Sequence, residues 1–269
     1  MTGGLPGGLA GGLAGGLAGA RVLIPRGGEW GARVADEIAR RGGIPLVAPL
    51  ITSAPPRDEH ARDAAFAALA VGEYDWLFVT SAASVEQLTA RGITIPATTQ
   101  VAAVGPATAR AVAATGAEVA FVPLGESSAA AMAAQWCAAR TPEQTGRALI
   151  IRSDLATAYL SDELALRGFD VDVCIGYRTV GVDLPDEVAA GLRDGTVDIV
   201  LLTSLSVARE LRRQVGALHP AVRVASIGPG TTRDAERLGF AVAHTARTQS
   251  VDALLAELDA SPDLPEESR

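Results

Sequence analysis

The sequence contains few of the residues from which metal sites and disulfide frameworks are built. Its 269 residues include two cysteines, Cys137 and Cys174, and three histidines. Two cysteines cannot form a metal cluster or a disulfide framework, and the histidines are scattered without the spacing of metal ligands. We therefore expect no metal site and a reducing compartment, the cytoplasm.

Positive charge and aromatic side chains are also scarce. The formal net charge is −8, and aromatic residues make up 4% of the chain. Nucleic acids and anionic membranes are bound by basic faces, so we expect neither as a partner, and no apolar run reaches the roughly 20 residues of a membrane span. The core should consist of small aliphatic side chains. An anionic ligand would have to be held by local groups.

The first 20 residues carry no charged side chain and repeat Gly-Gly-Leu-Ala. Ala-Gly-Ala at 18–20 resembles a signal-peptidase site, but no basic segment precedes it and glycines interrupt every apolar run. The glycine doublets also resemble a phosphate-binding loop, although no strand precedes them. Because glycine strongly disfavours helices, we expect a disordered tail over residues 1–20.

From Arg21 onward, short apolar runs alternate with alanine-rich helical stretches. This alternation is typical of a parallel sheet with helices on both faces, so the predicted fold class is α/β. The expected strands are residues 22–25, 76–80, 101–104, 119–122, 148–152, 199–203, 222–227 and 241–244.

The chain contains an internal repeat. Phe-Val-Thr-Ser at 78–81 recurs as Leu-Leu-Thr-Ser at 201–204, and Val-Gly-Pro at 104–106 recurs as Ile-Gly-Pro at 227–229, both 123 residues later. Matches at one offset indicate a duplication.

The beginning of the chain repeats with a different offset. Arg-Val-Leu-Ile-Pro-Arg at 21–26 resembles Arg-Ala-Leu-Ile-Ile-Arg at 147–152, which lies 126 residues later, and two further segments read as extended connectors. We therefore predict two similar three-layer parallel-sheet domains that face each other across a cleft, with the first βα unit swapped and a two-stranded linker between them. The predicted parts are a tail over 1–20, a first domain of 21–44 and 183–258, a second domain over 54–168, linkers over 45–53 and 169–182, and a C-terminal tail over 259–269.

Each predicted domain has two points at which a strand ends and a helix begins with Thr-Ser or Gly-Pro. Helix N-termini offer free amide donors to carboxylates and phosphates, and open α/β sheets bind ligands at this edge. The alternative interpretation is that these residues only cap helices. The candidate binding residues are Thr80, Ser81, Thr108, Thr203, Ser204, Thr231 and Thr232, with added charge from Arg26 and Arg152.

Common catalytic motifs are absent, since the chain has no Gly-x-Ser-x-Gly elbow, no His-Glu-x-x-His and no Walker loop. Asp75 and Asp198 occupy equivalent positions before two expected strands. Aspartate at a strand entrance usually forms a turn at the opposite edge, so we assign neither a catalytic role.

These motifs, taken together, resemble the uroporphyrinogen-III synthase family over about residues 21–258. The resemblance is carried by the Thr-Ser strand ends, by Val-Gly-Pro-Ala-Thr-Ala at 104–109 with its counterpart at 227–232, and by Tyr-Arg-Thr at 177–179. It implies two α/β domains joined by a two-stranded linker. It also implies conversion of hydroxymethylbilane, a linear tetrapyrrole, to uroporphyrinogen III without a cofactor. One departure is Arg26-Gly27, where the family usually has Arg-Pro.

The resemblance makes Tyr177 the candidate catalytic residue, as a donor to the departing hydroxyl of the substrate. The alternative is a linker tyrosine that only packs between the domains. The resemblance further implies a monomer and allows a transient contact with the preceding enzyme of the pathway. Two other functions stay open at this point: a two-lobed binding module or sensor for a small polyanion, and an enzyme acting on nucleotides or sugar phosphates.

Overall fold

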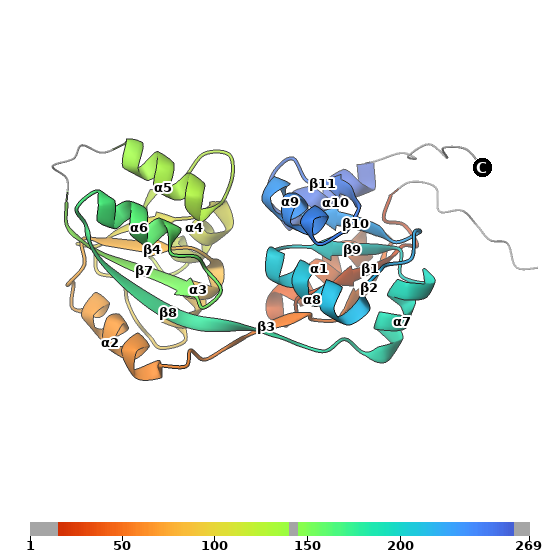
Figure 1. Ribbon diagram of the computed structural model, residues 1–269, viewed down its shortest axis with the longest axis horizontal. Coiled ribbons are helices and arrows are strands. Elements are labelled where there is room, and N and C mark those ends of the chain that lie inside the picture. Colours follow the sequence, from red (N-terminus) through yellow and green to blue (C-terminus); the bar gives the residue numbers. More distant parts are fainter. Residues whose placement is uncertain (1–15, 140–144, 261–269) are drawn as a thin grey trace, which may run out of the picture. The chain divides into compact units, whose positions relative to one another are not determined.

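The computed structural model describes residues 16–139 and 145–260. It divides into two compact units (Figure 1). The first unit lies within residues 1–50 and 183–269, and the second is residues 51–182. Within the described ranges, no helix is long and apolar enough to cross a membrane.

The first unit is built on a five-stranded, fully parallel sheet with the order β11-β10-β9-β1-β2. Its elements are β1 (Arg21–Ile24), α1 (Gly28–Arg40), β2 (Ile44–Val47), α7 (Asp186–Asp194), β9 (Ile199–Leu202), α8 (Leu205–Val215), β10 (Arg223–Ser226), α9 (Pro229–Arg237), β11 (Val242–Thr245) and α10 (Val251–Ala260).

The second unit is built on a six-stranded sheet with the order β3-β8-β7-β4-β5-β6, in which only β3 is antiparallel to its neighbour. Its elements are β3 (Ile51–Ala54), α2 (Glu59–Ala70), β4 (Trp76–Val79), α3 (Ala82–Thr89), β5 (Gln100–Ala103), α4 (Pro106–Ala113), β6 (Val119–Phe121), α5 (Ala129–Ala138), β7 (Arg147–Ser153), α6 (Tyr159–Leu166) and β8 (Asp170–Gly181).

The α/β prediction and all eight expected strands are confirmed. The two sheets also share one plan, since β4, β5, β6, β7 and β8 take the places of β9, β10, β11, β1 and β2. Both sheets have a register shift at the same repeat position, between Val101 and Ala102 and between Val224 and Ala225. The order in space is therefore the same, while the order along the chain is permuted.

The repeat is also visible at the amino ends of the strands. Asp75 Oδ2 accepts from the backbone N–H of Arg147 at 2.8 Å, and Asp198 Oδ2 accepts from that of Arg21 at 2.7 Å. Both aspartates thus join neighbouring strands at the edge opposite to the one where parallel sheets bind ligands. They have a structural role.

Helices cover both faces of the second sheet. Strand side chains alternate between the two faces, so Leu77 and Val79 of β4 pack under α2 and α3, while Trp76 and Phe78 pack under α5 and α6. The second face centres on Trp136, whose ring lies 5.0 Å from that of Phe78. The expected core of small aliphatic side chains is therefore wrong for this face, because the few aromatic residues are gathered there.

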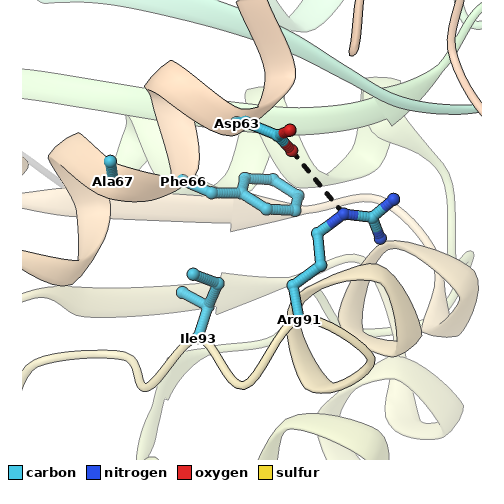
Figure 2. A pocket seen from close by; sticks show the side chains of 5 residues that line it. All are labelled: Asp63, Phe66, Ala67, Arg91 and Ile93. Atoms are coloured by element: carbon cyan, nitrogen blue, oxygen red, sulfur yellow. Dashed lines mark ion pairs between the residues drawn. The ribbon is translucent and has the colours of Figure 1, made fainter. Parts of the chain in front are cut away.

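Helix α2 and the segment after α3 leave a surface pocket of about 260 Å³ (Figure 2). Its lining is mostly apolar, with one ion pair of 3.6 Å between Asp63 and Arg91 Nε. Arg91 follows the C-terminal end of α3, so the pocket lies away from the carboxyl ends of the strands.

The structure corrects the predicted linkers. Residues 44–47 form β2, the edge strand of the first sheet, and most of 169–182 forms β8. Pro45 made β2 resemble a connector, because proline cannot donate to a ladder and so suits only an edge strand. Residues 51–54 pair antiparallel with residues 178–181 as β3 and β8.

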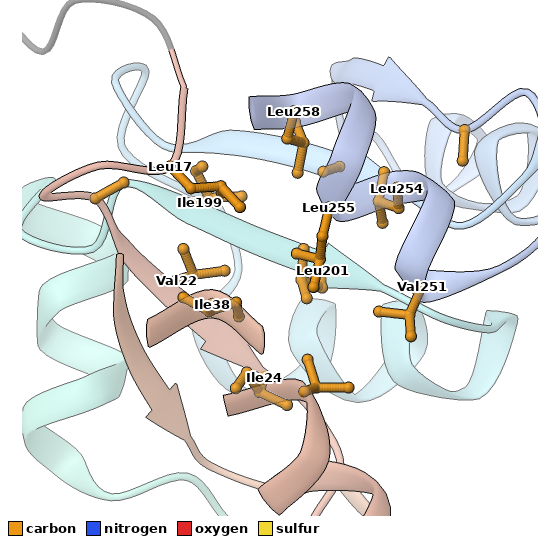
Figure 3. Close-up of a cluster of buried hydrophobic side chains, with 14 residues drawn as sticks. Leu17, Val22, Ile24, Ile38, Ile199, Leu201, Val251, Leu254, Leu255 and Leu258 are labelled. Carbon is orange, nitrogen blue, oxygen red and sulfur yellow. The ribbon is translucent and has the colours of Figure 1, made fainter. Parts of the chain in front are cut away.

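The predicted disordered tail is wrong for residues 16–20. Leu17 and Ala20 are fully buried against α1, β9 and α10 in the core of the first unit (Figure 3). Gly19 has φ +74°, and its N–H donates to the carbonyl of Gly42 at 2.8 Å. Gly19 thus allows a tight turn, and this turn places Leu17 in the core.

The predicted tails also include residues at both ends of the chain. Residues 1–15 and 261–269 lie outside the described residues. Residues 259–260, predicted to open the C-terminal tail, belong to the last turn of α10, which buries Leu254, Leu255 and Leu258 in the core of the first unit.

Candidate active site

Each sheet has one point at which the strand order reverses. In the first sheet it lies between β1 and β9, and in the second between β7 and β4. Ligands of open α/β sheets bind outside the carboxyl ends of the strands at such points. The loops that leave these four strands are therefore the candidate positions for a site.

The two Thr-Ser motifs lie at these points, and both serines cap helices. Ser81 Oγ accepts from the N–H of Ser84 at 3.2 Å at the start of α3, and Ser204 Oγ accepts from the N–H of Val207 at 3.4 Å at the start of α8. The capping interpretation therefore holds for both serines. It does not exclude ligand binding, because a capped helix keeps other free amides and a positive N-terminal end.

The two threonines differ in their hydrogen bonds. Thr80 Oγ1 donates to the carbonyl of Ile151 at 3.3 Å and so ties β4 to β7. Thr203 Oγ1, its copy, is buried and has no hydrogen-bond partner among residues 16–139 and 145–260. A buried hydroxyl without a partner is costly, so Thr203 differs from Thr80 in leaving an unsatisfied polar atom at its strand end.

Tyr177 lies beside Ser81. It is 8% exposed, and its phenolic oxygen is 2.8 Å from Ser81 Oγ. The pairing of β7 with β8 places Arg152 opposite Ile175 but Ser153 opposite Tyr177, so Gly176 is the extra residue of a bulge. A bulge redirects the side chain that follows it, and here it turns the phenol toward the start of α3.

The two candidate arginines make local contacts. Arg152 Nη1 donates to the carbonyl of Thr157 in the loop between β7 and α6, while its buried Nε has no partner within the described part of the chain. The Arg26 guanidinium stacks 5.1 Å from the centre of the Trp30 ring. Both arginines thus stay at the carboxyl edges of their sheets, but each is held by its own loop.

The Gly-Pro motifs begin α4 and α9, as predicted, but their threonines point inward. Thr108 and Thr231 are 4% and 8% exposed. Thr232 Oγ1 lies 2.7 Å from Thr245 Oγ1 and so joins α9 to β11. These three side chains are therefore packed within their units, and a ligand would meet the backbone amides of the helices instead.

Sequence reasoning missed two residues next to Tyr177. The hydroxyl of Ser84 contacts Ser81 Oγ at 3.1 Å, and the carboxylate of Asp154 accepts from the N–H of Thr179 at 3.0 Å. Asp154 also donates its own N–H to the carbonyl of Tyr177 at 3.2 Å. A comparison of the two repeats could have found Ser84, because the first unit has Val207 at the equivalent position.

The residues described here offer no evident metal centre. Across 16–139 and 145–260, no three His, Cys, Asp or Glu side chains are placed to hold a metal ion. His244 Nε2 lies 3.1 Å from the carboxylate of Glu257, which joins β11 to α10.

Comparisons with known proteins identify the family of this chain. The model of a family described as "Uroporphyrinogen-III synthase HemD" matches residues 32–256. A search among curated proteins found no match.

Two solved structures are similar over nearly their whole length. A mutant uroporphyrinogen III synthase from the extremely thermophilic bacterium Thermus thermophilus shares 20% identity at a TM-score of 0.62, covering 88% of this chain and 96% of that one. Uroporphyrinogen-III synthetase from Helicobacter pylori 26695 shares 16% identity at a TM-score of 0.55, covering 89% of this chain and 97% of that one. At these identities the structures show a common fold. Since the family model spans most of the chain, from α1 to α10, this protein belongs to the uroporphyrinogen-III synthase HemD family.

Proposed function

We propose that this protein is a uroporphyrinogen-III synthase that converts hydroxymethylbilane to uroporphyrinogen III and water, with inversion of the last pyrrole ring and without a cofactor. The observation that carries the proposal is the pairing of Tyr177 with Ser81, 2.8 Å apart, at the edge where the second sheet reverses its strand order. Family membership supports it.

The proposed substrate suits hydroxyl and amide donors. Hydroxymethylbilane has an acetate and a propionate on each pyrrole, and the N-termini of α3 and α8 favour negative charge. Each charge-assisted hydrogen bond contributes about 1.5–3 kcal/mol, so three to five of them would provide the roughly 8 kcal/mol of micromolar binding. An acidic protein can therefore bind this polyanion locally.

We assign the binding groups by their place at the carboxyl edges. Thr203 is a candidate because its hydroxyl, at the end of β9, has no hydrogen-bond partner in the described ranges and would gain one if a small local movement exposed it to substrate. Ser81 and Ser204 begin α3 and α8, whose free backbone amides would bind carboxylates. Arg26 after β1 and Arg152 near the end of β7 would supply positive charge from the neighbouring strands. Thr80 and Thr232 hold neighbouring elements together, and Thr108 and Thr231 support the start of α4 and α9 from inside.

The reaction needs a positioned substrate more than a strong base. A pyrrole nitrogen of hydroxymethylbilane can expel the hydroxyl group by itself, and the resulting azafulvene closes spontaneously to the type I isomer. The enzyme has to favour attack at the carbon that gives a spiro intermediate, which it does by holding one conformation. Tyr177 assists by donating a hydrogen bond to the hydroxyl as it leaves as water.

We further propose that the protein acts as a monomer in the cytoplasm, with neither nucleic acid nor membrane as a partner. The acidic balance of the chain supports the exclusion of these two partners, because both need a basic face.

Isomer analysis tests the proposed function. The full chain is incubated with freshly generated hydroxymethylbilane, the products are oxidised to porphyrins, and the isomers are separated by chromatography. We expect the type III isomer in excess over the type I isomer that forms without enzyme. Type I alone would refute the proposal. Binding of hydroxymethylbilane without any change in the isomer ratio would indicate a binding module instead.

A further inference from the structure

The phenol of Tyr177 belongs to a chain of three hydroxyl groups in the second unit. Its oxygen lies 2.8 Å from Ser81 Oγ, Ser81 Oγ lies 3.1 Å from Ser84 Oγ, and Ser84 Oγ lies 3.1 Å from the carbonyl oxygen of Ile151. Tyr177 is 8% exposed and Ser84 is fully buried. The chain therefore runs from the carboxyl edge of the sheet into the interior.

The number of hydrogens fixes the direction of each hydrogen bond. A carbonyl oxygen can only accept, so Ser84 donates its one hydroxyl hydrogen to Ile151. Ser84 must then accept from Ser81, which uses the only hydroxyl hydrogen of Ser81. Tyr177 is consequently the donor to Ser81 Oγ, and the phenolic hydrogen is directed at Ser81.

This direction is opposite to the one that the proposed chemistry needs. A phenol that assists a departing hydroxyl group must direct its hydrogen at the substrate. If the Ser81 hydroxyl rotates so that its hydrogen moves from Ser84 to the phenolic oxygen, the phenolic hydrogen is released and the heavy atoms stay in place. The hydrogen bond from Ser81 then stabilises negative charge on the phenolic oxygen as the phenol donates.

The duplicated first unit separates this arrangement from simple helix capping. Ser204, the copy of Ser81, caps α8 although Val207 stands where the second unit has Ser84. All three tyrosines of the chain lie within residues 51–182, so the first unit has no counterpart of Tyr177. The extra hydroxyl of Ser84 thus occurs in the copy that also has the tyrosine, and capping does not require it.

We propose that Ser81 is a positioning residue for Tyr177, and that rotation of the Ser81 hydroxyl switches the phenol from a resting to a donating state when substrate binds. Ser84 holds the resting state. This inference rests on the proposed function, because it needs a departing hydroxyl group for the phenol to assist.

Steady-state kinetics with hydroxymethylbilane test the switch. Ser81→Ala removes the hydrogen bond that Ser81 gives to the phenolic oxygen in the donating state, so kcat should fall by about ten- to a hundredfold while KM changes by less than about threefold. Ser81→Thr retains the hydroxyl and the cap and should restore most of kcat. Ser84→Ala removes the acceptor of the resting state, so kcat should rise by about two- to tenfold, the equivalent of one neutral hydrogen bond. Ile151 keeps a hydrogen bond from Thr80 in that variant.

Two controls separate the switch from loss of a cap. Ser128 caps α5 by accepting from the N–H of Ala131 at 3.1 Å, so Ser128→Ala loses a similar cap. Assayed at a temperature well below its melting temperature, this variant should have the same kcat as the parent protein. Adding Ser81→Ala to Tyr177→Phe should lower kcat no further, because both changes remove the same interaction.

The outcomes distinguish this inference from the proposed function. A chain that yields only the type I isomer refutes both. If Tyr177→Phe loses activity while Ser81→Ala does not, the switch is wrong and the proposed function stands. A fall in kcat for Ser84→Ala as large as that for Ser81→Ala also overturns the switch, since it would show that the three hydroxyls serve only as a rigid support.

Discussion

Replacing Leu17 by alanine tests whether residues 16–20 are a structural part of the first unit. Leu17 is completely buried, and its neighbours in the core include Ile38 of α1, Ile199 of β9 and Leu258 of α10 (Figure 3). The side chain thus packs against elements from both ends of the chain. Its removal would leave a cavity that these regular elements cannot easily fill.

The expected loss follows from the burial of the side chain. Leucine-to-alanine changes at fully buried positions cost about 2–5 kcal/mol, because the transfer energy and the cavity both count. With a urea dependence of about 2 kcal/mol per molar, in the middle of the usual range, the unfolding midpoint of the first unit should fall by about 1–2.5 M. Leu166→Ala in α6 is the matched control, since that leucine is 80% exposed and its loss should cost less than about 0.5 kcal/mol.

Urea titration followed by amide hydrogen exchange provides the measurement. Exchange in β1, β9 and β10 reports the first unit, and exchange in β4, β5 and β7 reports the second. Leu17→Ala should weaken protection in the first unit. A midpoint shift no larger than that of Leu166→Ala would show that residues 16–20 contribute nothing to the fold, contrary to their burial.

Three further predictions concern the site and its supports. Tyr177→Phe should lower kcat by about one to three orders of magnitude. Tyr74→Phe removes another buried phenol, which bonds to Asp172 at 2.8 Å at the amino edge of the second sheet, and should leave kcat unchanged. Equal effects of the two changes in the kinetic assay would deny Tyr177 a chemical role. Gly105→Ala should lower the free energy of unfolding in urea by about 1–3 kcal/mol, because the added Cβ would lie 2.2 Å from Ser127 Oγ. Adding Ser127→Gly removes that side chain and should restore the stability. A double variant as unstable as Gly105→Ala would contradict the assigned clash. Burial raises the pKa of the Cys174 thiol to about 12, so a thiol reagent at pH 8 should label it only after unfolding. Since the unfolded thiol ionises near pH 9, the stability linked to this thiol is present below that pH and is lost between pH 9 and 12. Cys174→Ala should therefore make the fall in unfolding free energy over this pH range less steep. An unchanged pH profile in that variant would exclude a contribution of the thiol.

Most of the sheet could be predicted because its signals are local. Buried parallel strands need continuous apolar runs, and Trp-Leu-Phe-Val at 76–79 and Ile-Val-Leu-Leu at 199–202 are such runs. Helix starts need serine or Gly-Pro at fixed places, so Ser81, Ser204, Gly105 and Gly228 marked the beginnings of four helices. The offsets of 123 and 126 residues then related the two halves.

The misassigned segments are those in which a residue has two structural uses. Glycine both disfavours helices and permits tight turns, and around Gly19 the second use brings Leu17 into the core. Pro45 disfavours central strands but suits an edge, and β2 is an edge strand. Only the surrounding structure selects between the two uses.

The sequence by itself determined the fold class, the repeat and the strand ends, since each is a pattern that can be read along the chain. The tertiary structure decided which hydroxyls meet. Tyr177 and Ser81 are 96 positions apart, and their contact depends on the pairing of β7 with both β4 and β8 and on the bulge at Gly176. Such contacts follow from strand register, which is a property of paired strands and cannot be read from either strand alone.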